Sequence, residues 1–429
     1  MNTLRLGIAG LGTVGAEVVR LVAERGALLA ERCGRPVAVT AVSARDRAKD
    51  RGLDLADIAW HEDARALAGD DNVDVVVELI GGEEGPARDL VRAALAAGKP
   101  VVTANKALIA RHGAGLADAA EAAGVPLALE AAVAGGVPIL KALRESLAGN
   151  RFSRVYGILN GTCNYILTVM EETGRSFEDV LAEAQALGYA EADPSFDIDG
   201  VDAAHKLAIL ASLAFGCRID FDGVHIEGIR HVDAADIRFA EQLGYRIKLL
   251  GIARRTDHGI EQRVHPCMVR RDTPIARVDA VFNAVVAEGD AVDRVVFEGR
   301  GAGAGPTASA VLGDICDIAR GLAVPAFSQA AESLAPAQTA DMARHVGPYY
   351  IRLTVIDQPG VIADVSAILR DERISIESML QQGRDPGEPV PVVLVTHDAQ
   401  EDALMRAMAR IGELETSLEA PRTVRIETL

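Results

Sequence analysis

The chain has 429 residues, which at about 150 residues per domain predicts three domains. Its 62 acidic and 44 basic side chains give a net charge of −18, and without any local basic stripe this excludes a nucleic-acid binder. The apolar share of 49% excludes a disordered chain, and no apolar run reaches the roughly 18 residues of a membrane span.

The first 130 residues alternate short apolar strands with Ala-rich helical stretches. A helix is expected after the first glycine turn, with others near 86–97 and 106–123. Strands are expected at 4–9, 37–42, 73–79, 100–103 and 126–131. Near-continuous apolar strands separated by helices indicate a parallel sheet covered on both faces. We therefore predict a Rossmann-type, doubly wound domain over residues 1–130.

Residues 131–305 have a mixed α+β character. The Gly-Gly-Val-Pro turn at 135–138 opens a helix, and a strong helix at 201–215 follows an acidic loop. Strands are expected at 154–162, 245–252, 262–270 and 292–298.

A Gly-rich run precedes a helix at 306–320, which we expect to pack back on the N-terminal domain. Residues 321–347 have no pattern and are expected to be a connector. Residues 348–429 then follow the order strand, helix, strand, strand, helix, strand. This order predicts a ferredoxin-like module.

A glycine loop joins the first strand to the first helix: Gly10, Gly12 and Gly15, with Thr13 and Val14 between them. In a strand–turn–helix context these glycines allow a tight turn, close approach of a pyrophosphate, and packing of the helix on the strand. The helix N-terminus supplies amide donors. The loop predicts a dinucleotide cofactor.

The end of the second strand indicates which dinucleotide is preferred. An NAD-specific site usually has an acidic residue there, whereas this chain has Ser43 followed by Arg45, Arg47 and Lys49. A hydroxyl and cations suit a 2′-phosphate, so we expect NADP(H), with NAD(H) as the alternative. The other interpretation is that these arginines are ordinary surface charges beside Asp46 and Asp50.

Two further segments carry candidate chemistry. Thr103-Ala-Asn105-Lys106 ends a parallel strand at the edge where ligands bind in such sheets. Asp202 and Lys206 are four residues apart on a helix, and hence on one face. They are either a surface ion pair or a substrate clamp with a lysine acid/base.

These motifs together resemble homoserine dehydrogenase. The matching segments run almost end to end: GLGTVG, TANKAL, EAAVAGGVPI, LNGTCNYIL, GYAEADPSFDIDGVDAAHKLAIL and GRGAGAGPTASAV. The resemblance implies NAD(P)-dependent interconversion of L-aspartate 4-semialdehyde and L-homoserine, on the route to threonine, methionine and isoleucine. It also implies that residues 131–305 form the catalytic and dimerisation domain.

The resemblance assigns roles to matching residues. Lys206 would give a proton to the forming alkoxide, and Lys106 would contact both cofactor and substrate. Glu191 and Asp202 would hold the substrate ammonium, with Asp197 as a weaker candidate and Gly188 as a backbone contact. The backbone or the side chains of Asn160, Gly161 and Thr162 offer donors to the substrate carboxylate. Thr103 would contact the cofactor, and Gly303 would close over it.

The family also binds a monovalent cation, usually Na⁺. The resemblance assigns its ligands to Glu130, Val133, Gly135 and Val137, chiefly through backbone carbonyls. The chemistry of these residue types alone does not predict a metal there.

The last 80 residues resemble an ACT domain, in which Asp357 and Gly360 occupy the usual effector position. We expect feedback inhibition by L-threonine, and a homodimer or homotetramer. The other interpretation is a purely oligomerising module. Because the glycine loop begins at once, we expect a monofunctional enzyme without a preceding kinase domain.

Two other functions remain open from the residues. The first is a semialdehyde dehydrogenase in which Cys163 is the thioester nucleophile. The second is an NADPH-binding regulatory protein without catalytic activity. The five cysteines, Cys33, Cys163, Cys217, Cys267 and Cys316, have no metal-ligand spacing. Their odd number and scattered positions predict reduced thiols in a cytoplasmic protein.

Overall fold

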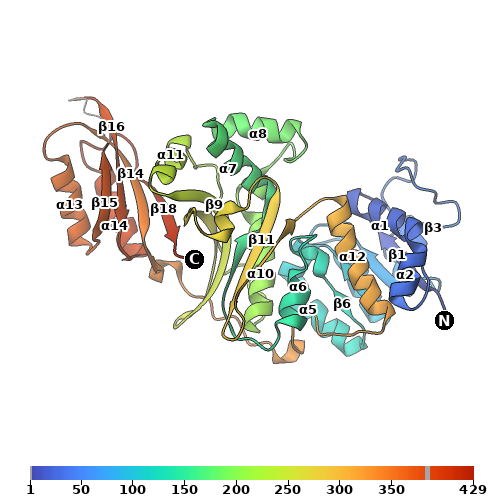
Figure 1. The fold of residues 1–429 in the computed structure, drawn as a ribbon. Coiled ribbons are helices and arrows are strands. Elements are labelled where there is room, and N and C mark those ends of the chain that lie inside the picture. Colours follow the sequence, from blue (N-terminus) through green and yellow to red (C-terminus); the bar gives the residue numbers. More distant parts are fainter. Residues whose placement is uncertain (1, 382–386) are drawn as a thin grey trace.

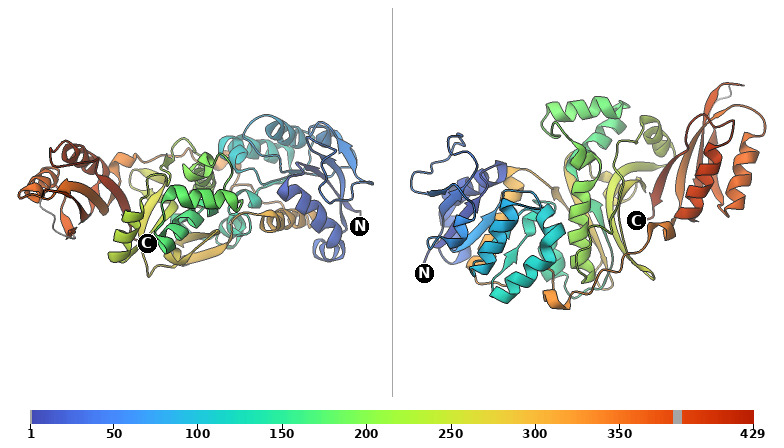
Figure 2. Two further views of the ribbon diagram at one scale, coloured as in Figure 1. Left: turned by 90° about the horizontal axis from the view of Figure 1, so that it is seen from above. Right: turned by 180° about the vertical axis from the view of Figure 1, so that it is seen from behind.

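The structure is a computed structural model that describes residues 2–381 and 387–429. It has three bodies in a row, with the N-terminal domain at one end, a central domain, and the C-terminal module at the other end (Figures 1 and 2). Within the described residues, no helix has the length and apolar character needed to cross a bilayer.

The N-terminal domain contains a six-stranded parallel sheet in the order β3-β2-β1-β4-β5-β6. This is the strand order of dinucleotide-binding doubly wound folds. All four residues of β4 are buried, as expected where helices cover both faces. The strands are β1 (Leu4–Ala9), β2 (Val37–Ser43), β3 (Ala59–His61), β4 (Val75–Glu78), β5 (Val101–Thr103) and β6 (Leu127–Ala128).

Two groups of helices cover this sheet. One apolar core joins the sheet to α1 (Thr13–Glu24), α2 (Gly26–Cys33) and α12 (Ala304–Ala319). The other face packs on α3 (Ala66–Gly69), α4 (Pro86–Ala96) and α5 (Lys106–Ala123). Helix α12 returns from the central domain and lies beside α1 (Figure 1), so the N-terminal domain is built from two separate stretches of chain.

The central domain is an antiparallel sheet in the order β12-β11-β7-β9-β10, and β8 (His225–Ile226) pairs with β10. Its strands are β7 (Phe152–Ile158), β9 (Tyr245–Thr256), β10 (Gly259–Arg270), β11 (Phe282–Gly289) and β12 (Asp293–Arg300). Its helices are α6 (Ile139–Lys141), α7 (Gly161–Thr173), α8 (Phe177–Ala186), α9 (Ser195–Ile198), α10 (Val201–Phe215) and α11 (Ala234–Gln242).

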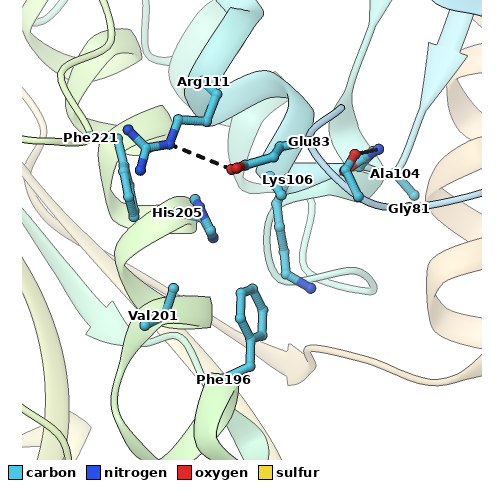
Figure 3. A pocket seen from close by; sticks show the side chains of 12 residues that line it. Gly81, Glu83, Ala104, Lys106, Arg111, Phe196, Val201, His205 and Phe221 are labelled. Atoms are coloured by element: carbon cyan, nitrogen blue, oxygen red, sulfur yellow. Dashed lines mark hydrogen bonds and ion pairs between the residues drawn. The ribbon is translucent and has the colours of Figure 1, made fainter. Parts of the chain in front are cut away.

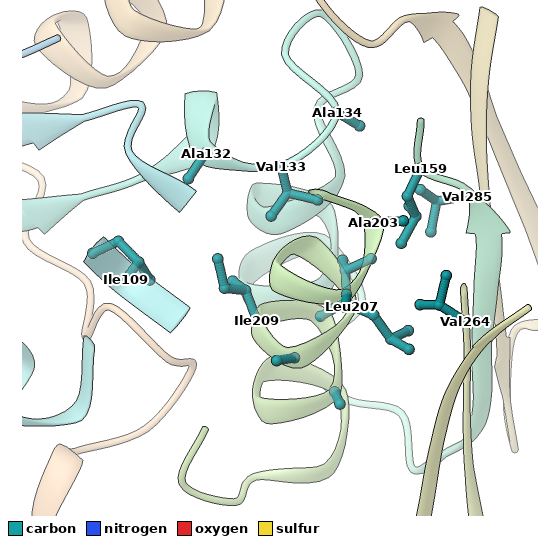
Figure 4. Close-up of a cluster of buried hydrophobic side chains, with 14 of the residues drawn as sticks. Ile109, Ala132, Val133, Ala134, Leu159, Ala203, Leu207, Ile209, Val264 and Val285 are labelled. Atoms are coloured by element: carbon teal, nitrogen blue, oxygen red, sulfur yellow. The ribbon is translucent and has the colours of Figure 1, made fainter. Parts of the chain in front are cut away.

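Helix α10 lies at the centre of the molecule, and almost all of its residues are buried. Ala203 and Leu207 face Leu159 and strand residues Val264 and Val285, whereas Ile209 faces Ile109 of α5 (Figure 4). The helix therefore packs against the central sheet on one side and against the N-terminal domain on the other.

The C-terminal module has the strand order β18-β14-β16-β15, with α13 (Val361–Asp371) and α14 (Glu401–Gly412) in one apolar core. Its strands are β14 (Tyr349–Ile356), β15 (Ile376–Gln381), β16 (Pro389–Thr396) and β18 (Arg422–Glu427). Strand β18 pairs in parallel with β10, with Cys267 opposite Arg425. The sheet of the module is therefore continuous with the central sheet, and the connector is not the only link between the two.

The fold class predicted from the sequence is confirmed, whereas several element boundaries were wrong. The strand predicted over 154–162 ends at Ile158, because Asn160 caps α7 through the amide of Cys163 (2.8 Å). The strand predicted over 126–131 shrinks to β6, because Glu130–Ala132 form a 3-10 turn. Strand β11 and helices α7, α8 and α11 were not predicted.

Short elements complete the described chain. The connector predicted at 321–347 holds two 3-10 turns and strand β13 (Val346–Gly347), which pairs with β17 (Ala399–Gln400). Helix α14 starts directly after β17, at Glu401. The remaining short helical segments are Ala142–Ser146, Pro274–Arg277, Ala331–Ser333 and Met342–Arg344.

Candidate active site

The glycine loop lies where β1 meets α1 and needs its glycines for steric reasons. Gly10 has φ of +95°, and a Cβ on it would lie 2.4 Å from the carbonyl oxygen of Leu79. A Cβ on Gly15 would lie 1.8 Å from the carbonyl oxygen of Gly10. At Gly12 an added Cβ meets no atom within 4 Å. Gly12 precedes α1, which has no side-chain cap, so amides near Thr13 and Val14 are left for an anion.

This loop borders a cavity of about 770 Å³ that Arg45 and Lys49 also line. Arg47 does not line it, and its guanidinium carbon lies 5.9 Å from the ring centroid of Trp60. Arg51 lines the cavity and was missed by the sequence analysis. It is fixed by donating to the carbonyl oxygens of Leu11 (3.1 Å), Lys49 (2.7 Å) and Asp46 (2.7 Å).

Lys106 is the first residue of α5, at the carboxyl end of β5. Asn105 caps the helix by accepting the amide of Leu108 (3.1 Å). The hydroxyl of Thr103 donates to the buried carboxylate of Glu78 (2.6 Å), which also accepts the amides of Ile80 and Gly81. Glu78 thus ties two adjacent loops together and fixes where Lys106 leaves the sheet. Glu78 was not predicted as a site residue, because a single carboxylate at the end of an apolar strand forms no recognisable sequence motif.

The structure brings Lys106, Asp202 and Lys206 together, although the two lysines come from different domains. Lys106 Nζ lies 3.0 Å from Asp202 Oδ1, and Lys206 Nζ lies 2.7 Å from Asp202 Oδ2. Burial alone would raise the pKa of Asp202, but the two ammonium groups outweigh it and hold that pKa well below its usual range. In turn, Asp202 and then neighbouring carboxylates raise the pKa of Lys106 against the effect of burial.

The side chain of Asn160 bonds carboxylates of the chain itself. Its side-chain NH₂ donates to Asp197 Oδ1 (2.8 Å) and to Asp202 Oδ2 (2.9 Å), not toward a substrate carboxylate. Thr162 Oγ1 donates to the carbonyl of Tyr189 (2.8 Å) and lies 3.4 Å from Asp197. Burial and then the charge of Asp202 raise the pKa of Asp197. Asp197 therefore lies beside Asp202, and a cation bound near it would stabilise its charged form.

The other predicted substrate residues lie on the loop after α8. Gly188, with φ of +75°, and Glu191 are both exposed there. The Gly188 amide donates to the carbonyl oxygen of Gln185 (3.1 Å), and the Glu191 carbonyl accepts from the side chain of Gln185 (2.9 Å). Within the described residues, the Glu191 carboxylate has no hydrogen bond or ion pair, yet its charge contributes to the raised pKa of Lys106. Gly303 precedes α12 with φ of +111°, and no side chain caps that helix.

Cys163 lies in the first turn of α7 with its Sγ 3.3 Å from the carbonyl oxygen of Asp197. Burial raises the pKa of its thiol, and the nearby carboxylates add to the effect. A thiolate is the reactive form of cysteine, so this environment argues against the nucleophile considered from the sequence.

The predicted cation ligands lie between β6 and α6. Both carboxylate oxygens of Glu130 accept amides, from Leu140 (3.1 Å) and Lys141 (2.7 Å). Burial and the neighbouring Asp314 raise the Glu130 pKa to about 7. No amide of the described chain donates to the carbonyls of Val133 or Gly135, whereas that of Val137 accepts from Ile139 (2.8 Å). These oxygens and the destabilised carboxylate fit a hard cation.

The two effector candidates flank the turn between β14 and α13. Gly360 precedes α13 with φ of +104°, and an added Cβ there meets no atom within 4 Å. The amide of Asp357 donates to Glu388 (3.0 Å), and its carbonyl accepts from Gly387 (3.0 Å).

Three family models match this chain. The model described as homoserine dehydrogenase matches residues 138–316, and that of the homoserine dehydrogenase NAD-binding domain matches residues 10–130. The ACT domain model matches residues 349–413.

Curated relatives match over nearly the full length. The homoserine dehydrogenase of Pseudomonas aeruginosa is 44% identical over 436 residues, covering 100% of both chains. That of Synechocystis is 43% identical and covers 99% of each chain.

Solved structures agree with these relatives. A homoserine dehydrogenase from Thiobacillus denitrificans has a TM-score of 0.94 at 44% identity, over 99% of this chain and 98% of that one. A hyperthermophilic archaeal homoserine dehydrogenase in complex with NADPH has a TM-score of 0.63 at 27% identity, over 74% of this chain and 97% of that one.

The ion pairs of Asp202 lead to a prediction about Lys106. Because Asp202 is the main cause of the raised pKa of Lys106, Asp202→Asn should lower that pKa and increase the neutral amine fraction at pH 8. We expect faster reaction of Lys106 with an amine-specific reagent, measured by peptide mass spectrometry. Asp199→Asn is the matched control, because Asp199 pairs with Arg230 and not with a lysine. An equal labelling rate in the wild type and Asp202→Asn would contradict the assignment.

Proposed function

The chain belongs to the homoserine dehydrogenase family, and on that premise we propose that Lys206 is the acid/base of its reaction, the NAD(P)-dependent interconversion of L-aspartate 4-semialdehyde and L-homoserine. The observation that carries the proposal is the placement of Lys106 and Lys206 on the two oxygens of one buried carboxylate, Asp202. When bound, the nicotinamide supplies or takes up the hydride. The residues of the chain orient the carbonyl and handle its charge and proton.

The hydrogen bonds of Lys206 leave one proton for the substrate. An ammonium group has three N–H donors. Lys206 donates one to Asp202 Oδ2 and one to the carbonyl oxygen of Leu159, each at 2.7 Å. These two hydrogen bonds fix the direction of the third N–H group, and its proton is the one that Lys206 gives to the alkoxide. The pKa of Lys106 is raised and its ammonium faces the same carboxylate, so Lys106 keeps its charge. It stabilises the negative charge that develops on the substrate oxygen.

Asp202 has little capacity left for the substrate ammonium, because two lysines and Asn160 already occupy its oxygens. Asp197 and Glu191 are therefore the carboxylates that we assign to the ammonium group, with Gly188 as a backbone contact. Binding of that cation would offset the raised pKa of Asp197. Asp202 then serves to position the two lysines.

For the cofactor we propose a preference for NADP(H) over NAD(H). The support is Ser43, Arg45 and Lys49 on the lining of the glycine-loop cavity, together with Arg51 fixed by three carbonyls. For the cation we propose Na⁺ held by Glu130, Val133, Gly135 and Val137. Its role is structural, since it offsets the buried charge of Glu130 between β6 and α6.

For the C-terminal module we propose binding of L-threonine near Asp357 and Gly360, with feedback inhibition. We also propose a homodimer or homotetramer. Among the described residues, β15 is the last strand of the sheet and has one unpaired edge, and Met379 on it is 49% exposed. These are features of a strand available for pairing. The five free thiols of the described chain support a cytoplasmic location.

The acid/base assignment is tested by Lys206→Met. We expect kcat to fall by about 10²–10⁴-fold, the usual contribution of a positioned proton donor, with an unchanged Kd for NADPH measured by fluorescence. Lys99→Met is the control, because Lys99 donates to the carbonyls of Leu67 and Asp70 away from the site. A kcat near that of the wild type would reject the assignment.

The cofactor preference is tested by comparing kcat/KM for NADPH and NADH. One hydrogen bond between charged groups is worth about 1.5–3 kcal/mol, so we expect NADPH to be favoured at least about tenfold. Arg45→Gln should reduce that ratio, whereas Arg47→Gln should leave it unchanged, because Arg47 lies on Trp60 and outside the cavity. A higher kcat/KM for NADH would overturn the preference.

The regulatory proposal is tested by measuring NADPH oxidation with millimolar L-threonine, and with D-threonine as the control ligand. We expect inhibition by the L-enantiomer alone. Asp357→Ala should raise the half-inhibitory concentration at least about tenfold, the effect of losing one charged hydrogen bond. Asp371→Ala, at the opposite end of α13, is the matched variant. Full activity at all L-threonine concentrations would contradict effector binding.

A further inference from the structure

A second cavity, of about 540 Å³, lies between α5 of the N-terminal domain and α9 and α10 of the central domain. Lys106 lines it together with Arg111, Glu83, Phe196, His205 and Phe221 (Figure 3). Apart from Lys106, no residue assigned above to substrate or cofactor lines this cavity. Its side chains therefore need an explanation of their own.

Five of these side chains form a continuous stack across the seam between the domains. Arg111 Cζ lies 4.4 Å from the Phe221 ring centroid, and the rings of Phe221 and His205 are stacked at 4.2 Å with an interplanar angle of 14°. His205 is 5.6 Å from Phe196, and Lys106 Nζ is 5.5 Å from the Phe196 ring centroid. Two cations of α5 thus enclose three rings of the central domain, an arrangement that ring faces favour.

The far end of this stack is anchored in both domains. Arg111 pairs with Glu83 (3.5 Å) on the loop after β4 and with Asp222 (2.5 Å), next to Phe221. The near end is anchored by Asp202, to which Lys106 is bonded at 3.0 Å. The stack therefore lies between the surface ion pairs of Arg111, whose partner Asp222 is 82% exposed, and the ion pair of Lys106 with the buried Asp202.

His205 is the middle ring and is 4% exposed. It precedes Lys206 on α10, so the same helix fixes the ring and the acid/base lysine. Burial lowers the His205 pKa to about 4, so the ring is neutral at pH 7 and adds no third cation to the stack. Its Nδ1 has no hydrogen-bond partner in the described chain, which leaves stacking as the contact that holds the ring.

We infer that Arg111 and Phe221 are positioning residues that, through the His205 and Phe196 rings, hold Lys106 in line with Asp202. The inference rests on the proposed role of Lys106 in contacting substrate and cofactor. Without the stack, the Lys106 side chain, which is 33% exposed, can leave Asp202 for solvent. The glycine-loop cavity shares no lining residue with this one, so the stack should affect NADPH binding only through the contact of Lys106 with the cofactor.

The experiment compares Phe221→Leu, which removes the ring, with Phe221→Tyr, which retains it. We expect Phe221→Leu to lower kcat about tenfold, since small misplacement of a reacting group is costly. The Kd for NADPH should stay within about twofold, and Phe221→Tyr should restore kcat. Amine labelling of Lys106 should become faster in Phe221→Leu and not in Phe221→Tyr. Labelling of the buried Lys248 should stay unchanged, whereas a general loss of stability would speed the labelling of both lysines.

Arg111→Met tests the other end of the stack and serves if Phe221→Leu does not fold. Its control is Arg88→Met, because Arg88 pairs with Glu84 on the same domain and touches none of the rings. His205→Phe keeps a ring and removes both nitrogens, so we expect near-normal kcat. A loss of kcat in His205→Phe as large as in Phe221→Leu would show that a nitrogen of His205 acts directly. That result would overturn the positioning role inferred for Arg111 and Phe221.

Lys106→Met separates this inference from the proposed function. If Lys106→Met has normal activity, the proposed role of Lys106 is wrong. If Lys106→Met is impaired while Phe221→Leu and Arg111→Met have normal kcat and normal labelling, the positioning role is wrong and the proposed function stands.

Discussion

The active site depends on one buried carboxylate shared by two lysines. Removing Asp202 from water is costly on its own, and the attraction of Lys106 and Lys206 more than offsets that cost, since the pKa of Asp202 is lowered and not raised. Two ammonium groups are thereby held on one carboxylate, in a chain whose net charge is −18. Their placement arises from the pairing geometry and not from composition.

This pairing can form only because α10 is buried between two domains. Lys206 and Asp202 lie on α10, whereas Lys106 begins α5 in the N-terminal domain. The apolar contacts of α10 with the central sheet and with Ile109 of α5 hold the two helices together (Figure 4). The return of α12 to the N-terminal domain adds a second connection across the same seam. The hydrophobic core thus sets the lysine–carboxylate distances.

The sequence predicted the parts of the structure whose signals are local. The glycine loop, the apolar strands before it and after it, and the i,i+4 spacing of Asp202 and Lys206 are readable because neighbouring residues determine them. Pairings between distant segments have no such signal. Neither the contact of Lys106 with Asp202 nor the donation from Thr103 to Glu78 can be predicted from spacing alone. Asn160 shows the same limit, because an amide suits a substrate carboxylate as well as Asp197 and Asp202.

The junction with the C-terminal module was also unpredictable from local pattern, although its physical consequence is clear. Arg425 of β18 donates to both oxygens of Glu227 at 2.9 Å and also bonds Glu401 of α14. The segment after Glu227 packs tightly on the acidic loop of the active site, since a Cβ on Gly228 would lie 2.2 Å from the carbonyl oxygen of Ile198. Ile229 donates its amide to that same carbonyl (2.8 Å).

A shift of β18 along β10 would therefore separate Arg425 from Glu227 or pull the Glu227–Ile229 segment away from Ile198. The Arg425 side chain is 9% exposed and that of Glu227 is 43% exposed, so their separation would leave a buried guanidinium without one of its two carboxylate partners. Arg425 would keep its bonds to Glu401, which lies in the same module. The cheaper displacement is one in which β18, the Glu227 segment and the loop that carries Asp197 move together. The module is thus joined to the loop that carries Asp197 through the Arg425–Glu227 ion pair and the close packing of Gly228 and Ile229 on Ile198.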